Sequence, residues 1–205
     1  MASFLTIVVP DSADAGDTQG PVPSAMAKYL ELLGPISGQR TPSVWVGHQV
    51  ENPNTVQAMI NLDVQNDKLQ QALQEHGTSM NSTTSLLVDK VSGHDAGEAL
   101  SAPVTELVTV SFIQDPPAPR YREDLGAFCR VLGSAAGCVG RAYGLTRETI
   151  ATNGGEGYAA LLMIGWTSVE AHLRFKATPV WTENIHLVRA PGASIEMHHV
   201  EFAHM

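Results

Sequence analysis

VQAMINLD at residues 56–63 and ALLMIGWT at residues 160–167 share one pattern, an apolar run centred on a Met-Ile pair and followed by an amphipathic stretch. Each predicts a strand that leads into a helix. When the two Met-Ile pairs are aligned, apolar strands before and after them also come into register. We infer a duplicated fold in which each half repeats one supersecondary unit.

The elements expected around these stretches have the same order in both halves. Strands are expected at residues 4–9, 44–50, 55–62 and 85–91 and again at 105–113, 137–147, 158–166 and 194–203. Helices are expected at residues 24–33, 66–76, 120–132 and 169–175, the last capped by Ser168, and a hairpin loop at 151–157. Each half is therefore β-α-β-β-α-β. The small and polar residues 93–103 are expected to link a unit of residues 1–93 to a unit of residues 104–205.

The clearest of these strands predicts how the halves pack. Val108, Val110 and Phe112 alternate with Thr109 and Ser111, which indicates a sheet with two differently buried faces. Helices cover one face of such a unit, so the two bare faces are expected to meet. The predicted fold class is α+β, with two tandem ferredoxin-like units whose antiparallel sheets pack face to face as a pseudo-dimeric barrel.

Composition restricts the partners. The net charge is −9 with only 12 Lys and Arg, which argues against a nucleic-acid or anionic-membrane surface. Cys129 and Cys138 lack metal-type spacing and are expected to be reduced thiols. The first residues lack the features of a signal peptide, and no apolar run approaches a membrane span. We expect a cytoplasmic protein with a small hydrophobic or aromatic partner, and a homodimer is compatible with the sequence.

Three stretches of the second half, TELVTVSF from residue 105, LMIGWTSVEAH from residue 162 and MHHVEF from residue 197, carry a family resemblance. They resemble the antibiotic-biosynthesis-monooxygenase type of the dimeric α+β barrel superfamily, and most of all its tandem fungal members. The resemblance implies a ligand site between a sheet and its helices. It also implies a cofactor-independent enzyme of secondary metabolism that catalyses cyclisation, dehydration or oxygenation of a polyketide-like or aromatic substrate. The alternative is a non-catalytic small-molecule-binding or stress-related barrel protein.

His198 and His199 are the first candidates for catalysis. Neighbours in a strand point to opposite faces, so the two cannot chelate one metal ion. If Val200 faces the helices, His198 faces the ligand pocket and His199 the barrel interior. Either is a candidate general base near neutral pH, with Tyr143 as the assisting hydroxyl. The alternative is a hydrogen-bonded structural histidine.

Five further side chains are candidates for substrate binding, namely Tyr158, Trp166, His172, Trp181 and His186. Aromatic side chains provide a flat apolar wall that suits a planar ligand. Trp166 is also compatible with core packing, and His172 with a solvated helix position. Related polyketide cyclases have a catalytic histidine where residues 177–181 lack one, and His186 replaces it only if the chain shifts by about one helical turn.

The sequence lacks the motifs of several well-known enzyme mechanisms. The sequence contains no nucleophile elbow, Walker loop, His-Glu-x-x-His or dinucleotide fingerprint, so neither a nucleotide cofactor nor a tightly held metal is expected. In the first half, Trp45 and His48 lie on opposite faces of their strand. That half is expected to be mainly structural, with one pocket per chain between the second sheet and the helices around residues 120–132 and 168–187.

Overall fold

The computed structural model describes residues 3–9, 43–62, 84–93, 96–113, 116–146, 150–152 and 155–205. The two helices expected at residues 24–33 and 66–76 lie outside these ranges. The first half contributes β1 (Ser3–Val9), β2 (Val44–Gln49), β3 (Val56–Leu62) and β4 (Thr84–Gly93). Then follow α3 (Ala96–Leu100), β5 (Val104–Ile113), α4 (Pro119–Leu132), β6 (Cys138–Leu145), β7 (Ile150–Thr152), β8 (Gly155–Trp166), α5 (Val169–Lys176), α6 (Pro179–Asn184), η1 (Ile185–Leu187) and β9 (Ser194–His204).

The strands form a closed antiparallel barrel, and this confirms the predicted fold class. The order of the sheet is β5-β9-β2-β3-β1-β4-β6-β8-β7, and an additional β5–β8 pairing closes the ring. Within each half, the fourth strand lies beside the first, the first beside the third, and the third beside the second. The β2–β9 and β4–β6 pairs join the two halves edge to edge. The bare faces of the two halves therefore meet across the barrel interior.

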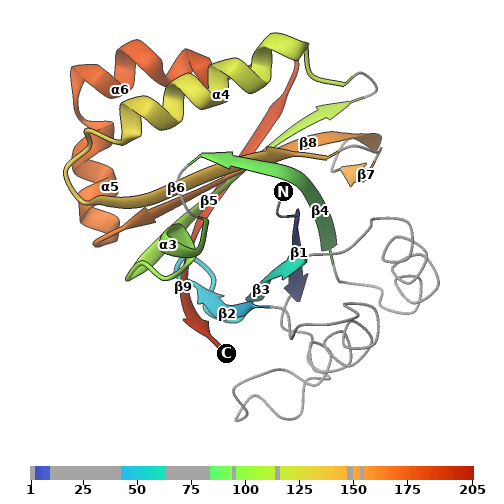
Figure 1. Cartoon of the computed structure of the whole chain (residues 1–205), viewed down its shortest axis with the longest axis vertical. Helices are drawn as coiled ribbons and strands as arrows, with labels where there is room; N and C mark the ends of the chain where they lie inside the picture. The colour runs from blue at the N-terminus through green and yellow to red at the C-terminus, as the bar shows by residue number, and fades with distance from the viewer. Residues whose placement is uncertain are drawn as a thin grey trace.

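Two apolar clusters lie on the two sides of the barrel wall. The interior cluster includes Met59 and Met163, the matching residues of the duplicated stretches, and both are fully buried. The outer cluster packs the second half against α4, α5 and α6, which lie together on one side of the barrel in Figure 1. Val110 and Phe112 belong to this outer cluster, as their alternation in the sequence predicted. Among the described helices, none is long and apolar enough to cross a bilayer.

The linker expected at residues 93–103 contains a short buried helix, which the sequence analysis missed. Helix α3 lies in the mouth of the barrel (Figure 1), with Ala99 and Leu100 fully buried. Two glycines make room for it. A Cβ on Gly140 would collide with the backbone nitrogen of Ala99, and one on Gly165 would lie 2.8 Å from the carbonyl oxygen of Ala99. The small residues of this linker are therefore packing residues.

The second half otherwise follows the prediction, with one correction in its hairpin. Residues 151–157 were expected to be a loop, but β7 pairs there with the beginning of β8, with Ile150 opposite Gly157 and Thr152 opposite Gly155. Ser168 caps α5 as expected, since its hydroxyl accepts a hydrogen bond from the backbone N–H of Ala171 at 3.2 Å. This cap begins the helix that carries His172.

Candidate active site

A buried carboxylic acid lies on the helix-facing side of β5. The alternation of this strand directs Glu106 to the same face as Val108 and Val110, and only 2% of Glu106 is exposed. One carboxylate oxygen, Oε2, accepts a hydrogen bond from the indole Nε1 of Trp166 at 2.9 Å. Loss of solvent raises the pKa of Glu106 to about 7, and the hydrogen bond from Trp166 only partly offsets this effect.

His172 lies next to this acid. It is fully buried on α5, and its ring stacks on that of Trp166, with 5.3 Å between the ring centroids. Its Nε2 is 3.4 Å from Oε1 of Glu106, and this buried nitrogen has no hydrogen-bond partner. Burial lowers the pKa of His172 to about 4. His172 is therefore a neutral imidazole near pH 7, with two nitrogens available for hydrogen bonding.

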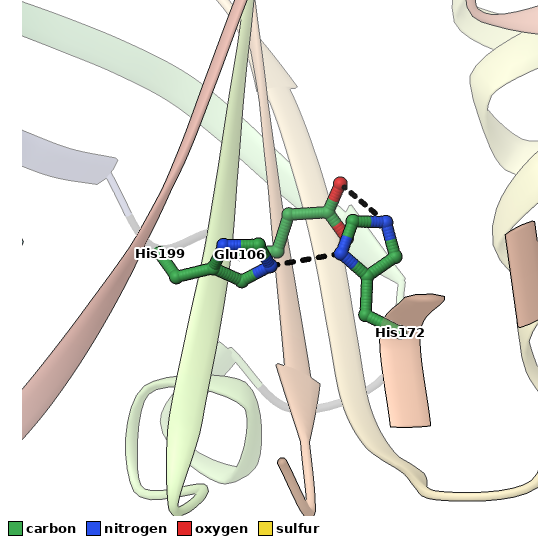
Figure 2. A group of neighbouring side chains, drawn as sticks. All are labelled: Glu106, His172 and His199. Atoms are coloured by element: carbon green, nitrogen blue, oxygen red, sulfur yellow. Dashed lines mark hydrogen bonds and ion pairs between the residues drawn. The ribbon is translucent and has the colours of Figure 1, made fainter. Parts of the chain in front are cut away.

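His199 joins this pair to the surface. Its Nε2 points toward Nδ1 of His172 (Figure 2) and lies 2.8 Å from it. On its other side, Nδ1 of His199 is 2.5 Å from Oε1 of Glu51. The backbone N–H of His199 also donates to Oε2 of Glu51 at 2.8 Å. The side chain of Glu51 is 47% exposed. A chain of four acid–base groups thus runs from the buried Glu106 to a carboxylate at the surface.

The faces predicted for the two adjacent histidines are reversed. Opposite residues of paired strands share a face; His199 lies opposite Glu106, and His198 opposite Leu107. His198 therefore faces the barrel interior, where its Nε2 is 2.6 Å from Oε1 of Gln57. The prediction assumed that Val200 must face the helices, but Val200 belongs to the interior cluster. An apolar residue cannot distinguish the two faces, because both are apolar in this barrel.

A cavity of about 190 Å³ opens beside Glu106, between the second half of the sheet and its helices. It is lined by Glu106, Val108, Phe128, Leu162, Ile164, Lys176, Trp181, Ile185, Val188, Arg189, Ile195 and Met197. The lining is mostly apolar, apart from one buried acid and two cationic side chains. Lys176 and Arg189 are exposed, and the ammonium of Lys176 lies 5.7 Å from the ring centroid of Trp181. The cavity lies where the sequence analysis expected a pocket.

Not all of the predicted site residues come together. Trp181 lines the cavity. Trp166 and His172 do not line it, but both contact Glu106, which does. Tyr143 is buried between β6 and α4, where a Cβ on Gly126 would lie 2.8 Å from its hydroxyl. Tyr158 lies opposite Phe112 and packs on the edge of the outer cluster. His186 lines a separate groove of about 470 Å³ near the beginning of α4.

Four residues of the site were missed, namely Glu106, Glu51, Lys176 and Arg189. Glu106 had a signal in the sequence, because it is the one charged residue in the otherwise apolar row Val104, Glu106, Val108, Val110 and Phe112. A charge on a buried face marks a functional candidate. The other three are ordinary surface residues by pattern, and only the folded chain brings them together.

The candidate ligands for a metal ion are side chains of this same site. Within the described part of the chain, Glu106, His172 and His199 form the group whose donor atoms come close enough together, within 4.8 Å. However, His172 presents Nδ1 to His199 and Nε2 to Glu106, so no single nitrogen of His172 faces both neighbours. The group is a chain of neighbouring acid–base residues, in which His172 and His199 share a hydrogen bond and His172 lies 3.4 Å from Glu106.

Comparison with solved structures agrees with the fold. An anthrone oxidase-like protein has a TM-score of 0.61 at 16% identity, with 99% of this chain and 91% of that chain covered. A candidate monooxygenase from Lactobacillus acidophilus NCFM has a TM-score of 0.55 at 12% identity, with 98% and 94% covered. Another from Fusobacterium nucleatum has a TM-score of 0.51 at 7% identity, with 98% and 92% covered.

At these identities the likeness shows the fold alone. The chain has the α+β barrel fold that its sequence resemblance implied, and these structures share that fold along nearly their whole length. Neither a protein-family model nor a curated protein matches the sequence.

Proposed function

We propose that this chain is a cofactor-independent enzyme that uses Glu106 as a general base on a hydrophobic, aromatic substrate. The observation that carries the proposal is a buried carboxyl group at the wall of an apolar cavity, with its pKa raised to about 7. A base is most effective when its pKa lies near the working pH. A structural carboxylate would be expected to pair with a cation, whereas Glu106 has an indole and a neutral imidazole as its neighbours.

The cavity lining indicates the class of substrate. Phe128 and Trp181 provide aromatic surfaces, and the remaining side chains from the sheet are aliphatic. Lys176 and Arg189 place positive charge beside the same cavity. Such charges stabilise the anion that forms when a base removes a proton next to a carbonyl group. We therefore propose a compact, planar substrate with an acidic C–H or phenolic O–H group conjugated to a carbonyl.

Oxygenation is the reaction that we propose to test first. One of the structures with this fold is an anthrone oxidase-like protein, and two others are candidate monooxygenases. For an anthrone, Glu106 would remove one proton from the ring methylene, and the resulting carbanion would react with O₂ to give a hydroperoxide. Loss of water from the hydroperoxide then gives the quinone. The balance is anthrone plus O₂ to anthraquinone plus water, with both methylene hydrogens in the water.

The experiment measures O₂ uptake and anthraquinone formation with anthrone as substrate. Glu106→Gln should lower kcat/KM by about 10²-fold or more, which is the usual scale for a lost general base. The amide keeps an oxygen that accepts the hydrogen bond from Trp166. Glu201→Gln is the matched control, because Glu201 is an exposed carboxylate on the same sheet. Equal turnover by wild type and Glu106→Gln would refute Glu106 as the base. Anthrone binding without turnover would instead favour a small-molecule-binding protein.

The biological setting is part of the same proposal. We propose secondary metabolism in a fungus, in the cytoplasm, with a small hydrophobic molecule and neither nucleic acid nor membrane as the partner. A polyketide synthase gene beside this one, and a changed set of metabolites after its deletion, would support that setting. Unchanged metabolites would favour a binding or stress-related role.

A further inference from the structure

We propose that Glu51, which belongs to the first half of the chain, sets the protonation state of Glu106 by holding a proton on His199. This inference rests on the proposed function, since it concerns how the base is kept ready for use. It makes Glu51 a positioning residue for the site, even though Glu51 does not line the cavity.

Glu106 has two polar neighbours, and they differ in what they can do. The indole of Trp166 is a donor only, so it cannot take a proton from the acid. His172 has a free Nε2 facing Oε1 of Glu106, at 3.4 Å. Its other nitrogen is within hydrogen-bond distance of His199, at 2.8 Å. In the described part of the chain, these contacts lead from Glu106 to the surface through His172.

Protons can be distributed over Glu106, His172, His199 and Glu51 in two ways that give every contact a donor and an acceptor. Both distributions contain the same number of protons. In the first, the proton is on Glu106, and both imidazoles are neutral with their protons on Nδ1. In the second, one proton has moved from Glu106 to Nε2 of His172, and another from Nδ1 of His172 to Nε2 of His199. His172 then donates to a Glu106 carboxylate, and His199 is an imidazolium beside Glu51. Only the second arrangement leaves Glu106 able to act as a base.

Glu51 is the group that favours the second arrangement. Its two oxygens are 2.5 and 2.8 Å from Nδ1 and the backbone nitrogen of His199. A carboxylate at this distance stabilises the charged form of an imidazole. Partial burial acts to raise the pKa of Glu51, but the hydrogen bonds from His199 outweigh it and lower the pKa below its ordinary value. Glu51 is therefore a carboxylate near neutral pH and remains available as the counterion.

Glu51 also acts on Glu106 directly, since repulsion between two carboxylates raises the pKa of Glu106, but this effect is smaller than the lowering by His199. Further charges come from the helix side. Lys176 on α5 and Arg189 beyond η1 line the cavity; Lys176 lowers the pKa of Glu106, and Arg189 adds positive charge at the same cavity. They act across the cavity mouth and are exposed, so solvent weakens their effect. Glu51 acts differently, because it determines which tautomer His172 adopts. A change in the tautomer of His172 therefore distinguishes this role of Glu51 from a merely structural role, which would leave the tautomer unchanged.

The first measurement needs no substrate. Long-range ¹H–¹⁵N spectra of wild type and Glu51→Gln near pH 7 report which nitrogens of His172 and His199 carry protons. In wild type we expect the Nε2–H form of His172 together with protonated His199. In Glu51→Gln we expect neutral His199 and the Nδ1–H form of His172. The amide still accepts the hydrogen bond from the backbone of His199, and Glu51 is exposed, so the fold should persist. The same tautomer of His172 in both proteins overturns the proposal.

The second measurement is the pH profile of kcat/KM with anthrone. Glu51→Gln should move the rising limb upward by roughly one pH unit, which is about a 10-fold loss on that limb. The reason is that loss of the charge on His199 outweighs loss of the smaller direct repulsion by Glu51, so Glu106 keeps its proton to higher pH. Glu201→Gln, the matched loss of charge, should leave the profile in place. If wild type does not turn over anthrone but the tautomers differ as expected, the proposed function fails and this inference stands. If Glu106→Gln is inactive while Glu51→Gln has the wild-type profile and tautomers, this inference fails alone.

Discussion

Glu51 contacts His199 through both of its carboxylate oxygens, although 148 residues separate the two in sequence. Glu51 follows β2 of the first half, and His199 lies on β9 of the second half. The β2–β9 pairing that joins the two halves brings them together, with Gln49 opposite Val200. The seam between the halves is therefore also part of the candidate site. In our proposal the first half is structural except at this one contact.

The buried acid predicts a pH-dependent stability. Because the pKa of Glu106 is raised from 4.5 to about 7, the folded chain binds this proton more tightly than the unfolded chain does. The free energy of unfolding that this tighter proton binding contributes is fully present below about pH 4.5 and is lost as the pH rises to about 7. Relative to Glu106→Gln, wild type should lose about 3 kcal/mol of unfolding free energy across this window. Urea unfolding at a series of pH values tests this; His172 is present in both proteins, so its own titration largely cancels. A pH-independent difference would contradict the raised pKa.

The indole of Trp166 predicts a shift in the pH profile. Its hydrogen bond lowers the pKa of Glu106, so Trp166→Phe should raise that pKa further and move the rising limb of kcat/KM to higher pH. Phenylalanine keeps an aromatic surface for the stacked ring of His172. The control is Trp45→Phe, which removes an indole that donates to Ser101 inside the barrel at 3.3 Å. An equal shift from Trp45→Phe would mean that the effect is not local.

The two adjacent histidines should differ in their effects. His199→Ala removes the imidazole between Glu51 and His172 and should lower kcat/KM at neutral pH by roughly 10-fold. His198→Ala, whose side chain contacts Gln57 in the barrel interior, should change it by less than about 2-fold. His48→Ala should have no effect, since His48 is exposed and its Nδ1 contacts the carbonyl oxygen of Pro53. Steady-state kinetics of the three variants measure these differences. A larger loss of kcat/KM from His198→Ala than from His199→Ala would favour His198 as the general base, as the sequence analysis predicts.

The helix in the barrel mouth predicts a cost for adding one methyl group. Gly165→Ala places a Cβ 2.8 Å from the carbonyl oxygen of Ala99, and a helix backbone cannot move aside freely. Overpacking of this kind should lower the unfolding free energy by about 1–3 kcal/mol. Gly133→Ala is the control, because the atom nearest to its new Cβ is the terminal nitrogen of the Arg141 side chain, which can shift more easily than a helix backbone. Urea unfolding of both variants provides the comparison. Equal stabilities of Gly165→Ala and wild type would mean that α3 does not pack there as described.

Local pattern was sufficient for most of the fold. The alternation around Val108 and Val110 predicted a strand with two different faces, and the Ser168 cap predicted where α5 begins. The repeat predicted equivalent places for Met59 and Met163, and both lie in the interior cluster. These features are properties of neighbouring residues, since side-chain direction and capping repeat over a few positions. They are therefore visible without any knowledge of the partner strands.

The site depended on contacts that no local pattern contains. The sequence determined that His198 and His199 lie on opposite faces of one strand, but the pairing of β9 with β5 decided which of them lies beside Glu106. Both faces of the barrel wall bury apolar side chains, so hydrophobicity could not orient the strand. Closure of the barrel then placed Glu51 of the first half on the outward-facing histidine. Strand register and barrel closure are long-range choices, made by the packing of the whole chain, and they determine which polar groups meet.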